Sequence, residues 1–100
     1  MSFEQVLIHP EAVVEAQAAA QWYRERSESA GEAFLSELDR AVEMILESPE
    51  MWPQYIHGTR RYLFHHFPFY LVYRQVSAKI EIVALAHGRR RPGYWKHRSA

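Results

Sequence analysis

Hydrophobic residues recur at helical spacing in the first half of the chain and alternate with polar residues in much of the second half. From Pro10 to about Arg26, strong helix formers predominate and apolar residues return every three or four positions. Pro10 suits the first position of a helix, where its missing N–H is not needed. The apolar face ends in Trp22 and Tyr23, which we expect to lie in the core. This pattern predicts a first helix.

A second helix is predicted from Ser29 to about Glu47. Ser29 and Glu32 have the spacing of a capping box. The residues that follow carry an apolar stripe at helical spacing: Phe34, Leu38, Val42, Ile45 and Leu46. Ser48-Pro49 ends the helix, because the residue before a proline avoids the helical region. The short connection between the two helices predicts a helical hairpin.

Strands are predicted on both sides of the hairpin. Residues 3–8 are β-prone, residues 60–66 and 69–76 alternate, and residues 79–87 form a nearly continuous apolar run. The continuous run indicates a central strand that is covered on both faces. Residues 50–58 contain proline, glycine and aromatic side chains, which indicates a loop packed over a core edge.

These elements predict one α+β domain spanning residues 1–100. We expect an N-terminal strand, an α-helical hairpin and then a three-stranded antiparallel meander, with the helices packed on one face of the sheet. The chain has no cysteine, which excludes disulfides and cysteine-based metal sites or nucleophiles. We find no signal-peptide pattern and no apolar run that could span a membrane, so we expect a cytoplasmic protein without metal or cofactor.

The formal net charge is +0, but the charge is divided sharply along the chain. Residues 1–59 carry three arginines and eleven acidic residues, a net charge of −8. Residues 60–100 carry nine basic residues and one acidic residue, Glu81, a net charge of +8. Such a division affects the choice of partner more than the fold. The second half is expected to attract anions; the alternative is that acidic helices neutralise a basic sheet within the domain.

Basic and aromatic side chains are concentrated in residues 87–98. Cations beside stacking surfaces suit a nucleic acid or an acidic protein surface. The segment directly follows the apolar run, so Tyr94 and Trp95 can fold back onto the sheet and anchor it. A frayed tail is then confined to residues 97–100.

Several short motifs occur in a characteristic order. They are Trp22-Tyr23, Ala33-Phe34-Leu35, Glu47-Ser48-Pro49, Arg60-Arg61, the run from Phe67 to Arg74, and the run from His87 to Trp95. In this order and spacing the chain resembles the RelE/ParE superfamily of type II toxin–antitoxin toxins over essentially its whole length. The last two runs are most similar to the ParE and plasmid-stabilisation branch.

The resemblance implies one of two activities. ParE-like members poison DNA gyrase, whereas RelE-like members are metal-free endoribonucleases that cut mRNA on the ribosome. Both kinds are neutralised by an antitoxin whose C-terminal segment wraps the toxin, and they contact operator DNA only through it. The resemblance therefore implies a hetero-oligomer with an antitoxin along the apolar sheet and helix surface. Possible lining residues there are Trp52, Tyr55 and Tyr73.

The positions that match the ribonuclease pattern carry its residues only in part. Arg61 and Leu63 stand where two lysines are expected, and Tyr70 stands where an arginine is expected. Arg90 matches the C-terminal arginine, while the C-terminal tyrosine falls near Lys96. Two of the basic groups are therefore missing.

We interpret the chain as a ParE-like toxin that binds a macromolecular target, DNA gyrase, without hydrolysing it. The alternative is a RelE-like ribonuclease, in which a histidine replaces a missing acid or base. The catalytic candidates in that case are His87, Arg90 and Tyr94. A third possibility is a non-toxic binding module. The target-binding candidates are basic residues and their aromatic neighbours: Arg61, Arg74, Arg89, Arg90, Arg91, Tyr94, Trp95 and Lys96.

Overall fold

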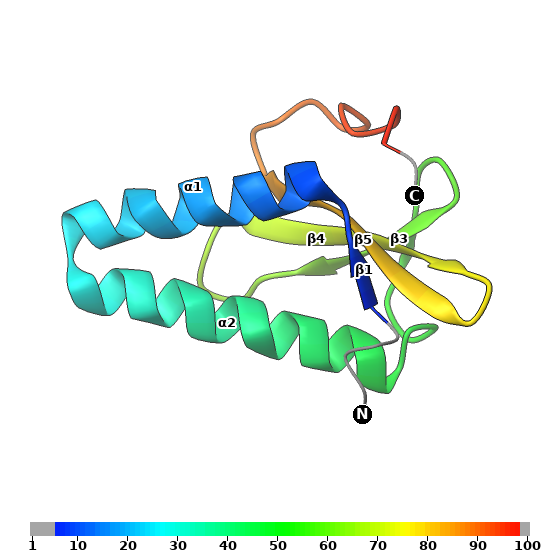
Figure 1. The fold of residues 1–100 in the computed structure, drawn as a ribbon, viewed down its shortest axis with the longest axis horizontal. Helices are drawn as coiled ribbons and strands as arrows, with labels where there is room; N and C mark the ends of the chain where they lie inside the picture. The colour runs from blue at the N-terminus through cyan, green and yellow to red at the C-terminus, as the bar shows by residue number, and fades with distance from the viewer. Residues whose placement is uncertain (1–5, 99–100) are drawn as a thin grey trace.

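The fold consists of a helical hairpin packed on a small sheet (Figure 1). The computed structural model describes residues 6–98, so residues 3–5 of the predicted first strand lie outside the described part of the chain. The elements in chain order are β1 (Val6–Ile8), α1 (Pro10–Arg26), α2 (Glu28–Glu47), β2 (Gln54–Tyr55), β3 (Thr59–Leu63), β4 (Phe69–Val76) and β5 (Lys79–His87). The predicted α+β class and the bounds of the last two strands are confirmed.

The strands form one five-stranded sheet in the order β1-β5-β4-β3-β2. β3, β4 and β5 are the predicted antiparallel meander, and β1 joins β5 in parallel. β5 lies between β1 and β4, and its apolar run is buried on both faces, as the pattern predicts. The short strand β2 was not predicted. It pairs with β3 inside the segment expected to be a loop.

β3 ends at Leu63, three residues earlier than the pattern predicts. The backbone N–H groups of His65 and His66 do not continue the ladder, because they donate to the carboxylate of Glu37 on α2. His66 Nδ1 lies 2.8 Å from the same carboxylate. One helix side chain therefore terminates the strand and holds the loop that follows it.

The two helices are joined by a single residue, Ser27. Its N–H donates to the carbonyl of Tyr23 and closes α1, while its Oγ accepts the N–H of Ala30 at 3.0 Å and caps α2. The capping box predicted at Ser29 is therefore wrong, and α2 begins one residue before it. The predicted start of α1 at Pro10 is confirmed.

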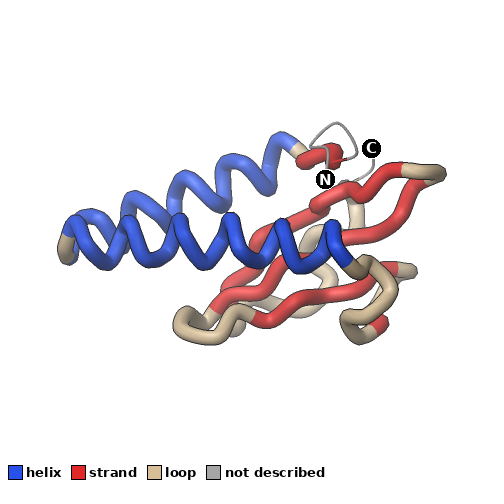
Figure 2. Tube along the Cα trace, turned by 90° about the horizontal axis from the view of Figure 1, so that it is seen from below, coloured by secondary structure: helices blue, strands red, loops and turns tan. Residues whose placement is uncertain are grey.

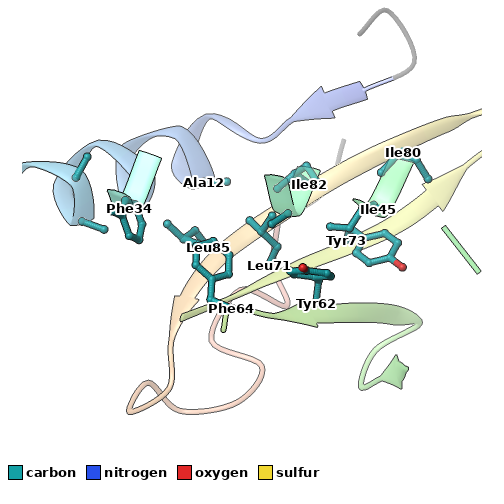
Figure 3. Close-up of a cluster of buried hydrophobic side chains, with 13 residues drawn as sticks. Ala12, Phe34, Ile45, Tyr62, Phe64, Leu71, Tyr73, Ile80, Ile82 and Leu85 are labelled. Carbon is teal, nitrogen blue, oxygen red and sulfur yellow. The ribbon is translucent and has the colours of Figure 1, made fainter. Parts of the chain in front are cut away.

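The helices lie side by side on one face of the sheet, and the hairpin end projects beyond the strands (Figure 2). The main core fills the space between them and the sheet, and Phe34 is fully buried within it (Figure 3). Tyr23 stacks on Phe34 with ring centroids 5.3 Å apart, so its predicted core position is confirmed. The same prediction for Trp22 is wrong, because the residue before Tyr23 lies about 100° away around the helix and is 51% exposed. Neither helix combines the length and the apolar character that crossing a membrane requires.

Candidate target-binding surface

The face of the sheet opposite the helices is covered by residues 88–98, which we call the basic strap. The strap leaves β5 and passes α1 on the side away from α2 (Figure 1). It has no helix or strand; successive turns link Arg90 N–H to the carbonyl of His87, Tyr94 N–H to Arg91, and Lys96 N–H to Gly93. Gly93 has φ +84°, a conformation that favours glycine. The strap is therefore an ordered structure.

Trp95 anchors the strap in the sheet. Its side chain is only 2% exposed and packs in a second buried cluster with Tyr70, Val72, Val83, Ala84 and Ala86. Tyr55 of β2 and His57 border its ring at centroid distances of 6.1 and 5.9 Å. The prediction that this segment folds back onto the sheet is confirmed. Because Trp95 is buried, it is not available to a partner, and we leave it out of the target-binding candidates.

Glu15 of α1 holds the other side of the strap. Its carboxylate accepts hydrogen bonds from Arg98 Nη1 and Nη2, at 2.8 and 2.9 Å, and from the hydroxyl of Tyr94 at 2.6 Å. Arg98 and Glu15 are both largely buried, and their hydrogen bonds raise the pKa of Arg98. We call Glu15, Tyr94 and Arg98 the strap clamp. Arg98 was expected in a frayed tail, but this ion pair fixes it.

The strap clamp also satisfies the open edge of β5. Within residues 6–98, β1 pairs with Ile80 to Ile82, and no strand neighbours the backbone of β5 beyond this point on that side. Leu85 N–H donates to Glu15 at 3.0 Å, and the carbonyl of Val83 accepts from Arg98 at 3.1 Å. Side chains therefore replace the missing strand, and they fix the strap relative to the sheet.

The solvent side of the strap carries a group of exposed cations. These are Arg89, Arg90, Arg91 and Lys96. The guanidinium of Arg90 lies 3.8 Å above the ring of Tyr94, which limits its motion. Four of the nine basic residues of the second half of the chain are thus displayed on a segment whose backbone is held from beneath.

Two further target-binding candidates, Arg61 and Arg74, lie on the same face of the sheet as the strap. Arg61 packs over the rings of Tyr55 and Tyr70, at 4.3 and 5.2 Å. Arg74 Nε donates to the buried carboxylate of Glu81 at 2.7 Å. Arg74 therefore compensates a buried charge, and Arg61 is the more available of the two.

The three catalytic candidates lie together beside a pocket between α1 and the strap. His87 Nδ1 accepts the N–H of Arg89 at 3.0 Å, so in the neutral ring Nε2 carries the proton. Burial and the hydrogen bond to Glu15 raise the pKa of Tyr94 far above its ordinary value. In this arrangement the hydroxyl of Tyr94 and Nδ1 of His87 are both engaged in hydrogen bonds.

Tyr70 stands where the ribonuclease pattern has an arginine, and it is buried. Burial and the contact with the hydroxyl of Tyr55 raise its pKa to about 12. It offers no positive charge at this position. Among residues 6–98, no three His, Asp or Glu side chains are placed to hold a metal ion.

A groove of about 1010 Å³ lies between α1 and α2, on the far side of α1 from the strap. Its walls are mainly apolar and include Ala16, Leu35, Leu38 and Val42, with β1 at one end. The residues that were expected to line an antitoxin contact lie elsewhere: Tyr73 is fully buried, Trp52 packs beside the main core, and Tyr55 borders Trp95.

Sequence reasoning missed Glu15 as a site residue. It reads as an acidic residue that suits the start of a helix, and its partner Arg98 is far away along the chain. The sequence carries one indication. The segment that contains Tyr94, Trp95 and Arg98 directly follows an apolar strand, so it can fold back onto the sheet.

Comparison with known proteins identifies relatives of this fold. The family model "ParE toxin of type II toxin-antitoxin system, parDE" matches residues 6–92. A solved structure, described as a chromosomal ParDE toxin–antitoxin system from P. aeruginosa, superposes with a TM-score of 0.63. It is 17% identical to this chain, and the match covers 83% of this chain and 94% of that one. A search of curated proteins gave no significant match.

Proposed function

Because the chain belongs to the ParE toxin family of type II toxin–antitoxin systems, we propose that it inhibits DNA gyrase through the basic strap and is neutralised by a cognate antitoxin. The observation that carries the proposal is a set of exposed cations on an irregular segment that is fixed by Trp95 and the strap clamp. A surface of this kind is preorganised for an anionic macromolecule, so little ordering entropy is lost on binding. The toxin acts in the cytoplasm, where gyrase works.

The antitoxin is proposed to occupy the groove between α1 and α2. The groove is mainly apolar and has a volume of about 1010 Å³, and an extended or helical segment seated in it would bury the exposed Val13 and Leu35. It lies across α1 from the strap, so the two partners approach different sides of one helix. Binding forms a hetero-oligomer, and contact with operator DNA is made by the antitoxin.

The ribonuclease alternative is supported by one observation, the grouping of His87, Arg90 and Tyr94 beside one pocket. Cleavage by a 2′-hydroxyl requires a base as well as an acid and a charge-stabilising group. Tyr94 is committed to Glu15, and His87 Nδ1 already accepts a backbone N–H. The strap therefore supports binding better than catalysis.

A gyrase assay tests the proposal. Purified toxin is incubated with gyrase, and both supercoiling and the accumulation of cleavage complexes are scored. We expect inhibition by the wild type and at least about tenfold weaker inhibition when the three consecutive arginines of the strap are changed together to alanine. The matched control also removes three exposed cations, by Arg24→Ala, Arg40→Ala and Lys79→Ala. It should inhibit like the wild type.

An unaffected gyrase together with ribosome-dependent cleavage of mRNA would overturn the proposal in favour of the ribonuclease. In that case His87→Ala should abolish growth arrest while the thermal unfolding transition is retained. Absence of growth arrest from the wild type, with the neighbouring gene deleted, would leave only the non-toxic binding module.

A further inference from the structure

A second pocket, of about 450 Å³, lies between α1, the start of β4 and the strap. Its volume falls in the range of sites that hold a small molecule or a side chain. Apolar groups form most of its lining, including Ala19, Tyr23 and Phe69, and its rim carries Trp22 and Arg90. The pocket is not part of the main core, because it opens to solvent beside the cations of the strap.

Trp22 is the unusual member of this rim. A tryptophan that is half exposed stabilises the fold little, but at an interface it is among the side chains that contribute most to binding. Arg26 lies over its ring with Cζ 3.4 Å from the centroid, and Tyr23 packs edge-on against it at 5.0 Å. The ring is therefore held in place at the mouth of the pocket without being buried.

Two arginines lie at the pocket. Arg90 lines it on the strap side, and Arg26 lies next to the lining, over the ring of Trp22, with the carboxylate of Glu25 3.8 Å from its guanidinium. Glu15 is the acidic side chain that lines the pocket; Arg98 neutralises its carboxylate, and the hydroxyl of Tyr94 donates a hydrogen bond to it. An apolar recess with one arginine in its lining and a second arginine over its tryptophan favours an apolar side chain with carboxylates beside it.

The aromatic faces around the pocket are partly occupied, which disfavours a stacked nucleobase. Arg90 covers the ring of Tyr94, Arg26 covers one face of Trp22, and Tyr23 stacks on Phe34. Single-stranded nucleic acids bind mainly by stacking their bases on free aromatic faces. A side chain that inserts into the recess needs no such face.

We propose that this pocket receives an apolar anchor side chain from an acidic protein segment of the target, with its carboxylates on Arg26 and Arg90. The inference rests on the proposed function, because the same target reaches the strap. Trp22 and the pocket then act as the anchor point of the interface, and the cations of the strap orient the target around it.

A peptide titration followed by NMR tests the pocket independently of gyrase. The probe is acetyl-Glu-Asp-Leu-Glu-Asp-amide, and the readout is the indole N–H signal of Trp22. Trp52 donates to the carbonyl of Met44 and Trp95 is buried, so their signals serve as internal controls. We expect a saturable shift at Trp22, at least about tenfold weaker with serine in place of the leucine or with neutral glutamine and asparagine in place of the acids.

Two variants of α1 provide the matched test with gyrase. Ala18→Glu places a larger, negatively charged side chain in the pocket, where it should repel an acidic segment. Gln17→Glu adds the same charge on the groove side of the helix. Both positions are exposed, so circular dichroism and thermal unfolding should match the wild type. Ala18→Glu should weaken gyrase inhibition at least about tenfold, and Gln17→Glu should not.

The two experiments separate the two proposals. A peptide-dependent shift at Trp22 with gyrase unaffected would support the pocket and overturn the target. Full inhibition of gyrase by Ala18→Glu, without a peptide shift at Trp22, would overturn the pocket and leave the proposed function intact. A shift of Trp22 by oligothymidylate and not by the peptide would also overturn it, in favour of a nucleic-acid site.

Discussion

The two faces of the sheet are covered in different ways. On one face, two helices bury a continuous core whose members recur at regular spacing along the chain. On the other face, an irregular segment of the chain is held by one tryptophan and by one buried ion pair. The first cover is distributed over many contacts, whereas the second depends on a few.

The difference shows how a small domain can display charge without losing order. A helix would have placed the three arginines on different sides, about 100° apart. The strap instead keeps Arg89, Arg90 and Arg91 exposed while Trp95 and Arg98 point inward. The strap is held mainly by its anchors, so single substitutions should affect the two faces of the sheet differently.

Loss of Trp95 should have the largest effect. Trp95→Ala removes the main anchor of the strap and leaves a cavity, and we expect the free energy of unfolding to fall by about 4 kcal/mol. Urea unfolding followed by circular dichroism measures it. Trp22→Ala is the matched control and should cost less than about 1 kcal/mol, because that ring is half exposed. Equal losses for the two variants would contradict the assignment of Trp95 as the anchor.

Arg74→Ala should cost about 3 kcal/mol, because it leaves the buried carboxylate of Glu81 without its partner. The double variant with Glu81→Gln should recover part of this loss, since the remaining side chain carries no charge. The measurement is again urea unfolding, analysed as a double-mutant cycle. Additive losses would show that the two side chains do not interact.

Glu15→Gln should destabilise the protein by about 2 kcal/mol, because the strap clamp loses its charged acceptor. Amide hydrogen exchange should accelerate in residues 88–98 and much less in α2. Glu11→Gln is the control, because the carboxylate of Glu11 is exposed and the variant loses only one charged contact with Arg98, at 3.8 Å. Unchanged exchange of the strap in the Glu15 variant would contradict the role of the clamp.

On the helix face, Glu37 makes stability depend on pH. Burial raises the pKa of Glu37, but the hydrogen bonds from His66 and from the backbone of His65 and His66 outweigh it and lower the pKa below its ordinary value. A lowered pKa means that the stabilisation is complete above the ordinary pKa and is lost as pH falls through the lowered one. The stability difference between wild type and Glu37→Gln, about 1 kcal/mol at pH 7, should therefore shrink from about pH 5 downwards. A constant difference down to pH 2 would contradict this assignment.

The helix-covered face could be predicted largely from the sequence. Helical and alternating periods are local, and they placed Phe34 in the core and β4 and β5 at their observed bounds. Errors arose where particular side-chain hydrogen bonds decide the outcome. Glu37 ends β3 from a distant part of the chain, and Ser27 caps α2 locally in place of the motif at Ser29.

The strap-covered face could be predicted only in part. The return of Trp95 onto the sheet followed from its position just after an apolar strand, and the structure confirms it. The clamp could not be predicted, because Glu15 and Arg98 share no local pattern. Trp22 was assigned to the core on periodicity, yet the helix face it occupies borders the strap and not the sheet.

The way in which the edge of β5 is closed also affects aggregation. β5 is the most apolar strand of the sheet, and its unpaired backbone beyond Ile82 would otherwise be a template for another chain. Glu15 and Arg98 occupy these backbone groups and place charge beside them. The strap clamp therefore also occupies the backbone groups through which β5 could otherwise pair with another copy of the chain.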